Sequence, residues 1–257
     1  MVVLMGGKKI INGRVHSIDT FSTLDGPGIR TVIFMQGCHL RCKYCHNPDT
    51  WDPEALTARK YSAEEIMKPI LRSLPYFKES GGGVTFSGGE PLLQAEFVRE
   101  VFEKCRENNI HTAIDTSLYV ASHTLLELLP VTNLFLADIK HIENESSIKL
   151  VGAGNRCNID NLQLINSRHV EIWIRYVIVP GLTDAEDHLL TMADFIAGLA
   201  SVTRVDLLPY HSLGSHKWKL LGLNYELDPI LPPSHTRMQE LKIMLENRSQ
   251  KPVFIPE

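Results

Sequence analysis

The chain has 257 residues, 22 % of them charged, and a formal net charge of −4 at pH 7. A weakly acidic chain argues against a protein that coats nucleic acid, and no apolar run approaches the roughly 20 residues of a membrane-spanning helix. The N-terminus MVVLMGGKK lacks the pattern of a secretion signal, and five cysteines, three of them clustered, suit a reducing compartment. We expect a cytoplasmic monomer that binds neither membranes nor nucleic acid.

Short apolar runs alternate with amphipathic segments along most of the chain. We predict strands at residues 31–37, 84–87, 110–115, 133–139, 170–180 and 203–208, and helices at 63–79, 93–108, 121–129, 159–167, 185–199 and 235–247. Near-continuous apolar strands indicate a parallel sheet that is covered on both faces. Six strand–helix units in series therefore predict an α/β fold, an incomplete (βα)6 TIM-like barrel with its helices outside.

A chain of this length is enough for one large domain. We expect a single domain over residues 1–257, with a short N-terminal extension at about 1–12 and a C-terminal loop and helix at about 212–257. Residues 212–234 are rich in Gly, Pro and Lys and are predicted to form a loop. Loops this long within a compact domain are often functional.

A cysteine motif follows the first predicted strand. The stretch GCHLRCKYCHN, residues 37–47, places three cysteines at C-x3-C-x2-C spacing, namely Cys38, Cys42 and Cys45. Three thiolates can hold three corners of a four-iron cluster and leave the fourth iron open to a small molecule. A structural zinc site completed by His39 or His46 is the alternative, and a disulfide would leave an odd cysteine. The spacing favours the open cluster and leaves zinc as an open alternative.

Polar and glycine residues follow the other predicted strands. Ser87-Gly88-Gly89-Glu90 follows the second strand, Asp115-Thr116-Ser117 the third, Asp138 and Lys140 end the fourth, Arg175 lies in the fifth, and Tyr210-His211 ends the sixth. Paired glycines let main chain approach a ligand closely. Because barrels keep their sites at the carboxyl ends of the strands, these groups predict one shared site.

The chain resembles the glycyl-radical activases of the radical S-adenosylmethionine (SAM) superfamily. The matching segments are TLDGPGIR, QGCHLRCKYCHNPDTWD, SGGGVTFSGGEPLLQAEFV, LADIK, WIRYVIVPG and LLPYHSLGSHKW, and they cover nearly the whole chain from about Gly13. The cysteine motif, with the aromatic Tyr44 before its last cysteine, and GGE are superfamily features. The segments DGPGIR and YHSLGSHKW point to the activases.

The resemblance implies roles for the matching residues. Cys38, Cys42 and Cys45 would hold a [4Fe–4S] cluster, and these cysteines with Lys140 and His211 would be catalytic. The SAM contacts would be Tyr44, Cys45, His46, Gly88, Gly89, Glu90, Asp138, Ile139, Lys140, Arg175 and His211, with Glu90 and the two glycines at the methionine amino group. A monovalent cation, Na⁺ or K⁺, would be held by Asp115, Thr116, Leu136 and Asp138. The family usually has glycine where this chain has Leu118, which enters positive-φ conformations less cheaply.

The resemblance also implies the reaction and its partners. Reductive cleavage of SAM would give a 5′-deoxyadenosyl radical that takes a hydrogen atom from a glycine of pyruvate formate-lyase, with a flavodoxin- or ferredoxin-type reductant, in anaerobic glucose metabolism. The alternatives are activation of another glycyl-radical enzyme, a radical reaction on a small molecule, or a zinc-binding interaction module. We also expect Lys217 and Trp218 to offer a basic and aromatic surface to the partner's glycine loop.

Overall fold

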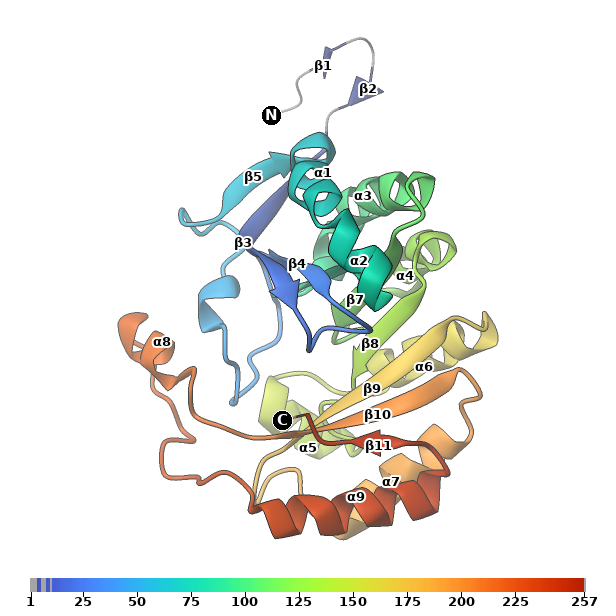
Figure 1. Ribbon diagram of the computed structural model, residues 1–257. Helices are drawn as coiled ribbons and strands as arrows, with labels where there is room; N and C mark the ends of the chain where they lie inside the picture. Colours follow the sequence, from blue (N-terminus) through green and yellow to red (C-terminus); the bar gives the residue numbers. More distant parts are fainter. Residues whose placement is uncertain (1–3, 6–7, 10, 257) are drawn as a thin grey trace.

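The computed structural model describes residues 4–5, 8–9 and 11–256, and its centre is a nine-stranded mixed sheet (Figure 1). In spatial order the strands are β11 (Val253–Phe254), β10 (Val202–Pro209), β9 (Glu171–Ile178), β8 (Leu134–Asp138), β7 (His111–Thr116), β6 (Gly83–Gly88), β4 (Arg30–Met35), β3 (Asn12–Ser22) and β5 (Arg59–Ser62). The strands from β11 to β4 are all parallel. The pairs β4–β3 and β3–β5 are antiparallel.

Helices cover the outside of this sheet, and each predicted strand has a counterpart in it. The helices are α1 (Ala63–Arg72), α2 (Leu74–Ser80), α3 (Ala95–Glu107), α4 (Ser122–Leu128), α5 (Asn144–Val151), α6 (Arg156–Ser167), α7 (Glu186–Ala197), α8 (Ser215–Leu220) and α9 (His235–Ser249), with short 3-10 turns η1 (Pro48–Thr50), η2 (Pro91–Gln94) and η3 (Leu129–Val131). In the described part of the chain the edge strands β5 and β11 do not pair with each other. The predicted incomplete, TIM-like barrel is therefore confirmed.

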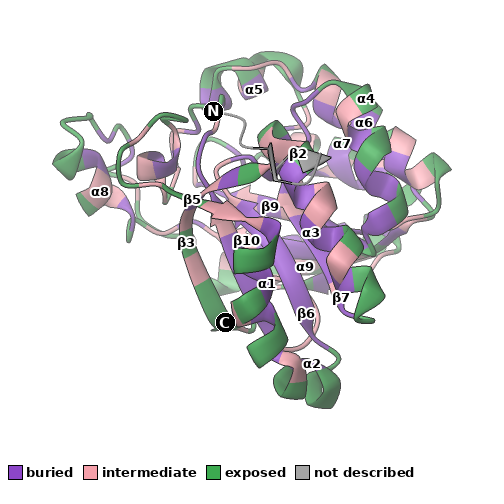
Figure 2. Cartoon of the chain, turned by 90° about the horizontal axis from the view of Figure 1, so that it is seen from above, coloured by how far each residue is buried: buried purple, intermediate pink, exposed green. Residues whose placement is uncertain are grey.

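Both faces of the sheet are buried, as parallel strands require. Ile114 and Phe135 belong to the main apolar cluster, which includes helix residues, whereas Ala113 and Leu134 form a smaller cluster with the partly buried Trp173. Figure 2 shows the same arrangement, with buried strands at the centre and helices whose exposed sides face outward. Within the described residues, no helix is both long and apolar enough to cross a membrane.

Several element predictions need correction. The helix predicted over 63–79 is two helices, because the chain breaks at Ser73 and Pro75 begins the second. Ser62 caps the first of these helices, since its hydroxyl accepts from the N–H of Glu65 in a capping box. The sequence analysis missed β3, β5, β11 and α5, and it read α8 as loop. Of the predicted N-terminal extension, residues 4–5 and 8–9 form the hairpin β1 (Leu4–Met5) and β2 (Lys8–Lys9), while 1–3, 6–7 and 10 lie outside the described residues.

A fully buried arginine explains the DGPGIR segment. Arg30 begins β4, and its guanidinium donates to the carbonyl of Val84 at 2.5 Å and to Thr85 Oγ1 at 2.9 Å in β6, while Nη1 lies 3.1 Å from His111 Nδ1 in β7. The hydroxyl of Thr85 in turn donates to the carbonyl of Asp25 at 2.6 Å. Arg30 therefore joins three neighbouring strands and anchors the turn that carries Asp25.

We predict that Arg30→Met destabilises the fold strongly. The variant fills a similar volume but leaves the acceptors on Val84, Thr85 and His111 without their buried donor. The free energy of unfolding should fall by at least about 2 kcal/mol, measured by urea denaturation. The exposed Arg72 of α1 provides the control, because Arg72→Met should change the value by no more than about 0.5 kcal/mol. Equal effects of the two substitutions would contradict the assignment.

The same contact predicts a loss of stability in acid. Burial, and then the charge of Arg30, lower the pKa of His111 from 6.5 to about 4. Between pH 6.5 and about 4, His111 is protonated in the unfolded chain but stays neutral in the folded one. The free energy of unfolding therefore decreases as the pH falls through this range. His111→Asn keeps an acceptor for Arg30 and removes the titration. Urea denaturation of the apoprotein should therefore show that the free energy of unfolding falls more steeply with decreasing pH in the wild type than in this variant. Parallel pH dependences would contradict the role of His111.

Candidate active site

A cavity of about 550 Å³ opens at the carboxyl ends of the parallel strands. Its wall brings together most of the predicted site residues, namely Cys38, Cys42, Tyr44, Cys45, His46, Gly88, Gly89, Asp115, Thr116, Asp138, Lys140, Arg175 and His211. Three predicted residues, Glu90, Leu136 and Ile139, are almost completely buried, and none of them lines the cavity. Residues separated by more than 170 positions in the sequence thus share one wall, as the strand order predicts.

The cysteine loop, residues 37–47, is fixed by main-chain hydrogen bonds to two segments that follow it in the sequence. The N–H of Gly37 donates to the carbonyl of Thr50 at 2.7 Å, and the N–H of Cys38 donates to that of Trp51 at 3.1 Å. On the other side, Arg41 and Lys43 donate to the carbonyls of Val151 and Leu150 at the end of α5, at 2.9 and 3.0 Å. The loop is therefore held at two places, although it contains no regular secondary structure.

The two glycines after β6 are required by this packing. A Cβ on Gly88, which has φ +106°, would lie 2.4 Å from the N atom of Met35, and a Cβ on Gly89 would lie 2.2 Å from the carbonyl oxygen of Gly37. Only glycine permits the turn to pack so closely against β4 and the cysteine loop. The sequence analysis explained the two glycines by the close approach of a ligand to their main chain. The structure shows that the main chain of Met35 and Gly37 also lies too close to them for a side chain.

The three thiols form one group on the cavity wall. Burial raises the pKa of Cys38 and Cys42 to about 12 and that of Cys45 to about 11, and each thiol raises the pKa of another in the trio. The ammonium of Lys140 lowers the pKa of all three. Three cysteine thiols on one cavity wall near one cation are the residue types that hold an iron–sulfur cluster.

Lys140 is itself buried and paired. Its Nζ lies 2.7 Å from Asp138 Oδ2 and 5.8 Å from the centroid of the Tyr44 ring. Burial alone would lower the pKa of Lys140, but Asp138 outweighs it and raises that pKa well above its ordinary value. Lys140 therefore stays positively charged inside the cavity, where its charge favours the thiolate forms of the cysteines.

A second ion pair occupies the other side of the cavity. Arg175 Nη1 lies 3.1 Å from Asp115 Oδ2, which also accepts from the hydroxyl of Ser87 at 2.6 Å. Asp25 Oδ1 lies 3.8 Å from the same guanidinium. The sequence analysis did not include Asp25 among the site residues, although its DGPGIR segment was the signal that could have placed it here.

The predicted cation donors come from the neighbouring strands β7 and β8, where Asp115 is the Cα partner of Leu136. Their side chains already have protein partners. Thr116 Oγ1 donates to Glu90 at 2.6 Å, while Asp115 and Asp138 pair with Arg175 and Lys140, respectively. The monovalent-cation site remains a prediction.

Glu90 is a buried anchor rather than part of the cavity wall. Its carboxylate accepts four hydrogen bonds, from Thr116 Oγ1 at 2.6 Å, Ser117 Oγ at 2.5 Å, Ser117 N at 2.9 Å and Leu92 N at 3.1 Å. Burial raises the pKa of Glu90, and these donors oppose the shift. The carboxylate thus accepts from four donors of the protein itself, and the contact of Glu90 with the methionine amino group stays a prediction.

The turn after β7 contains a leucine in a left-handed conformation. Leu118 has φ +59° and is fully buried, so the chain adopts here the conformation that glycine usually provides. Two asparagines of α6 hold the turn, since Asn158 donates to the carbonyl of Ser117 and Asn161 to that of Leu118, each at 2.9 Å. The sequence analysis did not identify these asparagines, and only their presence in an otherwise apolar helix face could have indicated them.

Comparison with known proteins then decides the family. The pattern of the Radical SAM superfamily matches residues 32–193. The chain is 45 % identical over 237 residues to the pyruvate formate-lyase-activating enzyme of Clostridium pasteurianum, covering 92 % of this chain and 98 % of that protein. It is 41 % identical over 244 residues to the pyruvate formate-lyase 1-activating enzyme of Escherichia coli K12, covering 94 % and 98 % of the two chains.

The chain belongs to the pyruvate formate-lyase-activating enzymes of the radical SAM superfamily. The family implies a [4Fe–4S] cluster and S-adenosylmethionine as cofactors. The fold agrees with it, because a radical SAM methyltransferase from Sphaerobacter thermophilus superposes with a TM-score of 0.65 at 18 % identity, over 88 % of this chain and 66 % of that one.

In this activating enzyme, the short helix α8 contacts the cysteine loop directly. Trp218 is buried, its ring packs edge-on against that of Trp51 with 5.0 Å between centroids, and its Nε1 donates to the carbonyl of Cys45 at 2.9 Å. Lys217 Nζ donates to Asn47 Oδ1 at 2.8 Å and lies 3.1 Å from Asp49 Oδ2. The expected surface for the partner's glycine loop is thus wrong for Trp218, which is buried against the enzyme's own loop, and stays a prediction for the partly exposed Lys217.

Two histidines lie together on the cavity wall, one from the cysteine loop and one that follows β10. The rings of His46 and His211 stack with 4.0 Å between centroids, and His46 Nε2 lies 3.2 Å from the carbonyl oxygen of His211. Burial lowers the pKa of both rings, so both favour the neutral form. Neutral rings can offer one donor and one acceptor each to a polar ligand in the cavity.

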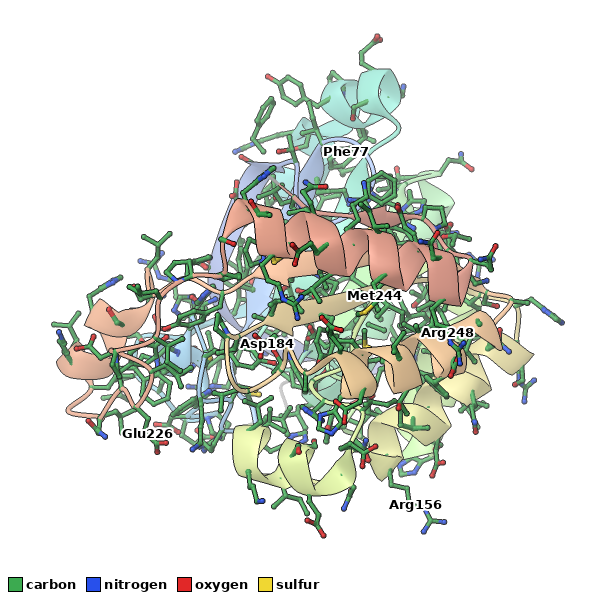
Figure 3. The ribbon with its side chains drawn as sticks, turned by 90° about the horizontal axis from the view of Figure 1, so that it is seen from below. Phe77, Arg156, Asp184, Glu226, Met244 and Arg248 are labelled. Atoms are coloured by element: carbon green, nitrogen blue, oxygen red, sulfur yellow. The ribbon has the colours of Figure 1, made fainter. Side chains whose placement is uncertain are left out.

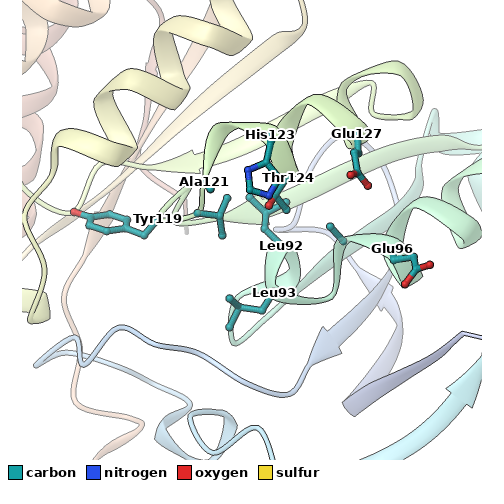
Figure 4. Close-up of a pocket in the computed structure, with 10 residues that line it drawn as sticks. Leu92, Leu93, Glu96, Tyr119, Ala121, His123, Thr124 and Glu127 are labelled. Atoms are coloured by element: carbon teal, nitrogen blue, oxygen red, sulfur yellow. The ribbon is translucent and has the colours of Figure 1, made fainter. Parts of the chain in front are cut away.

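A second hollow of about 430 Å³ lies outside this wall (Figure 4). It is formed by η2 and the start of α3 on one side and by residues 119–127 on the other, with Leu93, Glu96 and His123 among its lining. None of the predicted site residues lines it. We therefore assign the chemistry to the larger cavity, where the thiols and the paired charges meet.

We predict that Glu90→Gln weakens the fold as well as SAM binding. An amide has one acceptor oxygen instead of two, and its NH₂ group would face either the donors of Thr116 and Leu92 or those of Ser117. The free energy of unfolding of the apoprotein should fall by about 1–3 kcal/mol in urea denaturation. Unchanged stability together with lost SAM affinity, measured by anaerobic calorimetry, would instead support direct contact between Glu90 and the cofactor.

Proposed function

We propose that this protein is an oxidoreductase, the [formate-C-acetyltransferase]-activating enzyme, which installs a glycyl radical in pyruvate formate-lyase. When bound, the reduced [4Fe–4S] cluster supplies one electron that cleaves SAM to methionine and a 5′-deoxyadenosyl radical, which takes one hydrogen atom from the partner's glycine. The observation that carries the proposal is the trio of buried or partly buried thiols near Lys140, on one cavity of a chain from this family.

The cysteines would hold the cluster. Cys38, Cys42 and Cys45 supply three thiolates and no fourth, which suits a cluster with one iron left for the amino and carboxylate groups of SAM. Cluster loading must release the thiol protons that burial retains, and Lys140 offsets the negative charge that results. The family membership and this donor chemistry support the open cluster over the zinc alternative.

The remaining wall residues would bind and orient SAM. Tyr44 and His46 offer aromatic surface to the adenine, and the main chain of Gly88 and Gly89 faces the methionine end. Lys140 and Arg175 offer positive charge to its carboxylate, with Asp115 and Asp138 beside them. A cavity of about 550 Å³ matches the size of pockets for ligands of this class. Holding the reacting groups in place is the protein's main contribution to the rate.

Several finer points extend this proposal. A flavodoxin- or ferredoxin-type protein would supply the electron, and the enzyme would act as a cytoplasmic monomer with one radical SAM domain over residues 1–257. A monovalent cation would sit near Asp115, Thr116, Leu136 and Asp138. Ile139 would contact SAM through its main chain, because its side chain is buried away from the cavity.

The test is anaerobic reconstitution with pyruvate formate-lyase. The reduced, SAM-supplied enzyme should produce a glycyl radical signal in electron paramagnetic resonance, along with 5′-deoxyadenosine. Formation of 5′-deoxyadenosine with other glycyl-radical enzymes, but no radical on pyruvate formate-lyase, would assign the activity to a different partner. Zinc without iron or sulfide in the purified protein would refute the proposal.

We predict that Cys42→Ala abolishes both cluster loading and SAM cleavage, because two thiolates cannot hold the cubane. Iron and sulfide analysis and 5′-deoxyadenosine formation measure the two losses. Cys105→Ala is the matched control, since Cys105 lies in the core 3.9 Å from Met67 Sδ and outside the cavity. Its variant should load iron normally. Retained cleavage in Cys42→Ala after reconstitution would contradict the assignment.

A further inference from the structure

One stretch of the surface combines exposed leucines with basic side chains. On α8, His216, Lys219 and Leu220 follow the i, i+3, i+4 spacing of one helix face, and all three are exposed. Leu213 before the helix is 76 % exposed and Leu220 is 83 % exposed. We call this surface the α8 ridge, and its members are Leu213, His216, Lys219, Leu220, Leu221 and Leu223.

The opposite face of α8 is fixed, so the ridge leucines cannot simply turn inward. Trp218 is anchored on the carbonyl of Cys45, and Lys217 is anchored on Asn47 and Asp49. The N–H groups of Leu221 and Leu223 donate to the carbonyl of Trp218, at 3.2 and 2.9 Å, which continues the turn beyond the helix. The exposed leucines are thus presented outward on a braced support.

The α8 ridge is continuous with the wall of the active-site cavity. His211 lines the cavity, and the chain passes from it through Gly214 into α8. Gly214 packs against the cysteine loop so tightly that a Cβ there would lie 2.7 Å from the Cα of His46. In Figure 1 α8 projects from the sheet on the side of the cysteine loop, and Figure 3 shows it well away from α9.

We propose that the α8 ridge is the docking surface for the folded protein whose glycine enters the cavity. This inference rests on the proposed function, because a main-chain glycine of a large protein can reach the cavity only if the rest of that protein lies against its rim. Clustered exposed leucines mark protein interfaces. The partner surface should be apolar, with carboxylates placed opposite Lys219.

The test uses the double variant Leu213→Asp/Leu220→Asp in the reconstituted holoenzyme. Acidic side chains remove apolar contact and repel the carboxylates expected on the partner. The KM for pyruvate formate-lyase in glycyl radical formation should rise roughly tenfold or more. Iron content and 5′-deoxyadenosine formation without the partner should stay at the wild-type level, because neither leucine lines the cavity. The control is Ile243→Asp on α9, where Ile243 is 57 % exposed, and its KM should not change.

Other occupants of the α8 ridge give different results. An unchanged KM in the double variant would overturn the proposal. So would a defect that appears with a protein electron carrier but not with a chemical reductant, which would assign the ridge to the carrier. A wild-type dimer that becomes monomeric in the variant with unchanged KM would assign it to a second copy. Failure of the wild type to form any glycyl radical would overturn the proposed function itself, and the ridge proposal with it.

Discussion

The structure depends on the rigidity of a loop that has no regular secondary structure of its own. Three cysteines within eight residues become a ligand set only when their main chain is fixed, because a mobile loop would lose conformational entropy on binding the cluster. Its N–H groups donate to carbonyls at the end of η1 and at the end of α5, and the carbonyl of Cys45 accepts from Trp218 of α8. The supports from α5 and α8 come from distant parts of the sequence, so the site exists only once the chain has folded.

The positively charged side chains of the cavity are paired with carboxylates of the protein itself. Lys140 pairs with Asp138, and Arg175 pairs with Asp115. Buried unpaired charges are very costly, so each cation needs a carboxylate in the apoprotein. A cofactor that carries both an ammonium and a carboxylate can exchange partners with such pairs without leaving an isolated charge. This suits the amino acid end of S-adenosylmethionine.

Glu90 and α8 lie near the cavity and support the residues that line it. Glu90 joins the turn after β6 to the turn after β7, and both turns contribute residues to the cavity wall. Helix α8 connects the cysteine loop, on its inner face, to an exposed apolar surface on its outer face. A partner that docks on this surface would therefore rest on the same element that supports a cluster ligand.

The sequence by itself determined the parallel strands, most of the helices and the family. Continuous apolar runs indicate strands that are buried on both faces of a sheet. The cysteine spacing and the GGE motif are local sequence features, so they can be recognised without any tertiary contact. It also predicted which residues would meet, since the carboxyl ends of parallel strands must share one edge. These are properties of neighbouring residues or of strand direction, and both can be read along the chain.

Only the tertiary structure decided which way each side chain faces. Trp218 was expected at a surface, yet it donates to Cys45, and Glu90 accepts from Thr116 and Ser117. The antiparallel strands β3 and β5 escaped prediction because they are largely polar and exposed, and so lack a strong apolar pattern. Leu118 adopts a glycine-like conformation because asparagines from α6 hold its turn. Each outcome depends on a partner far away in the sequence, which no local pattern specifies.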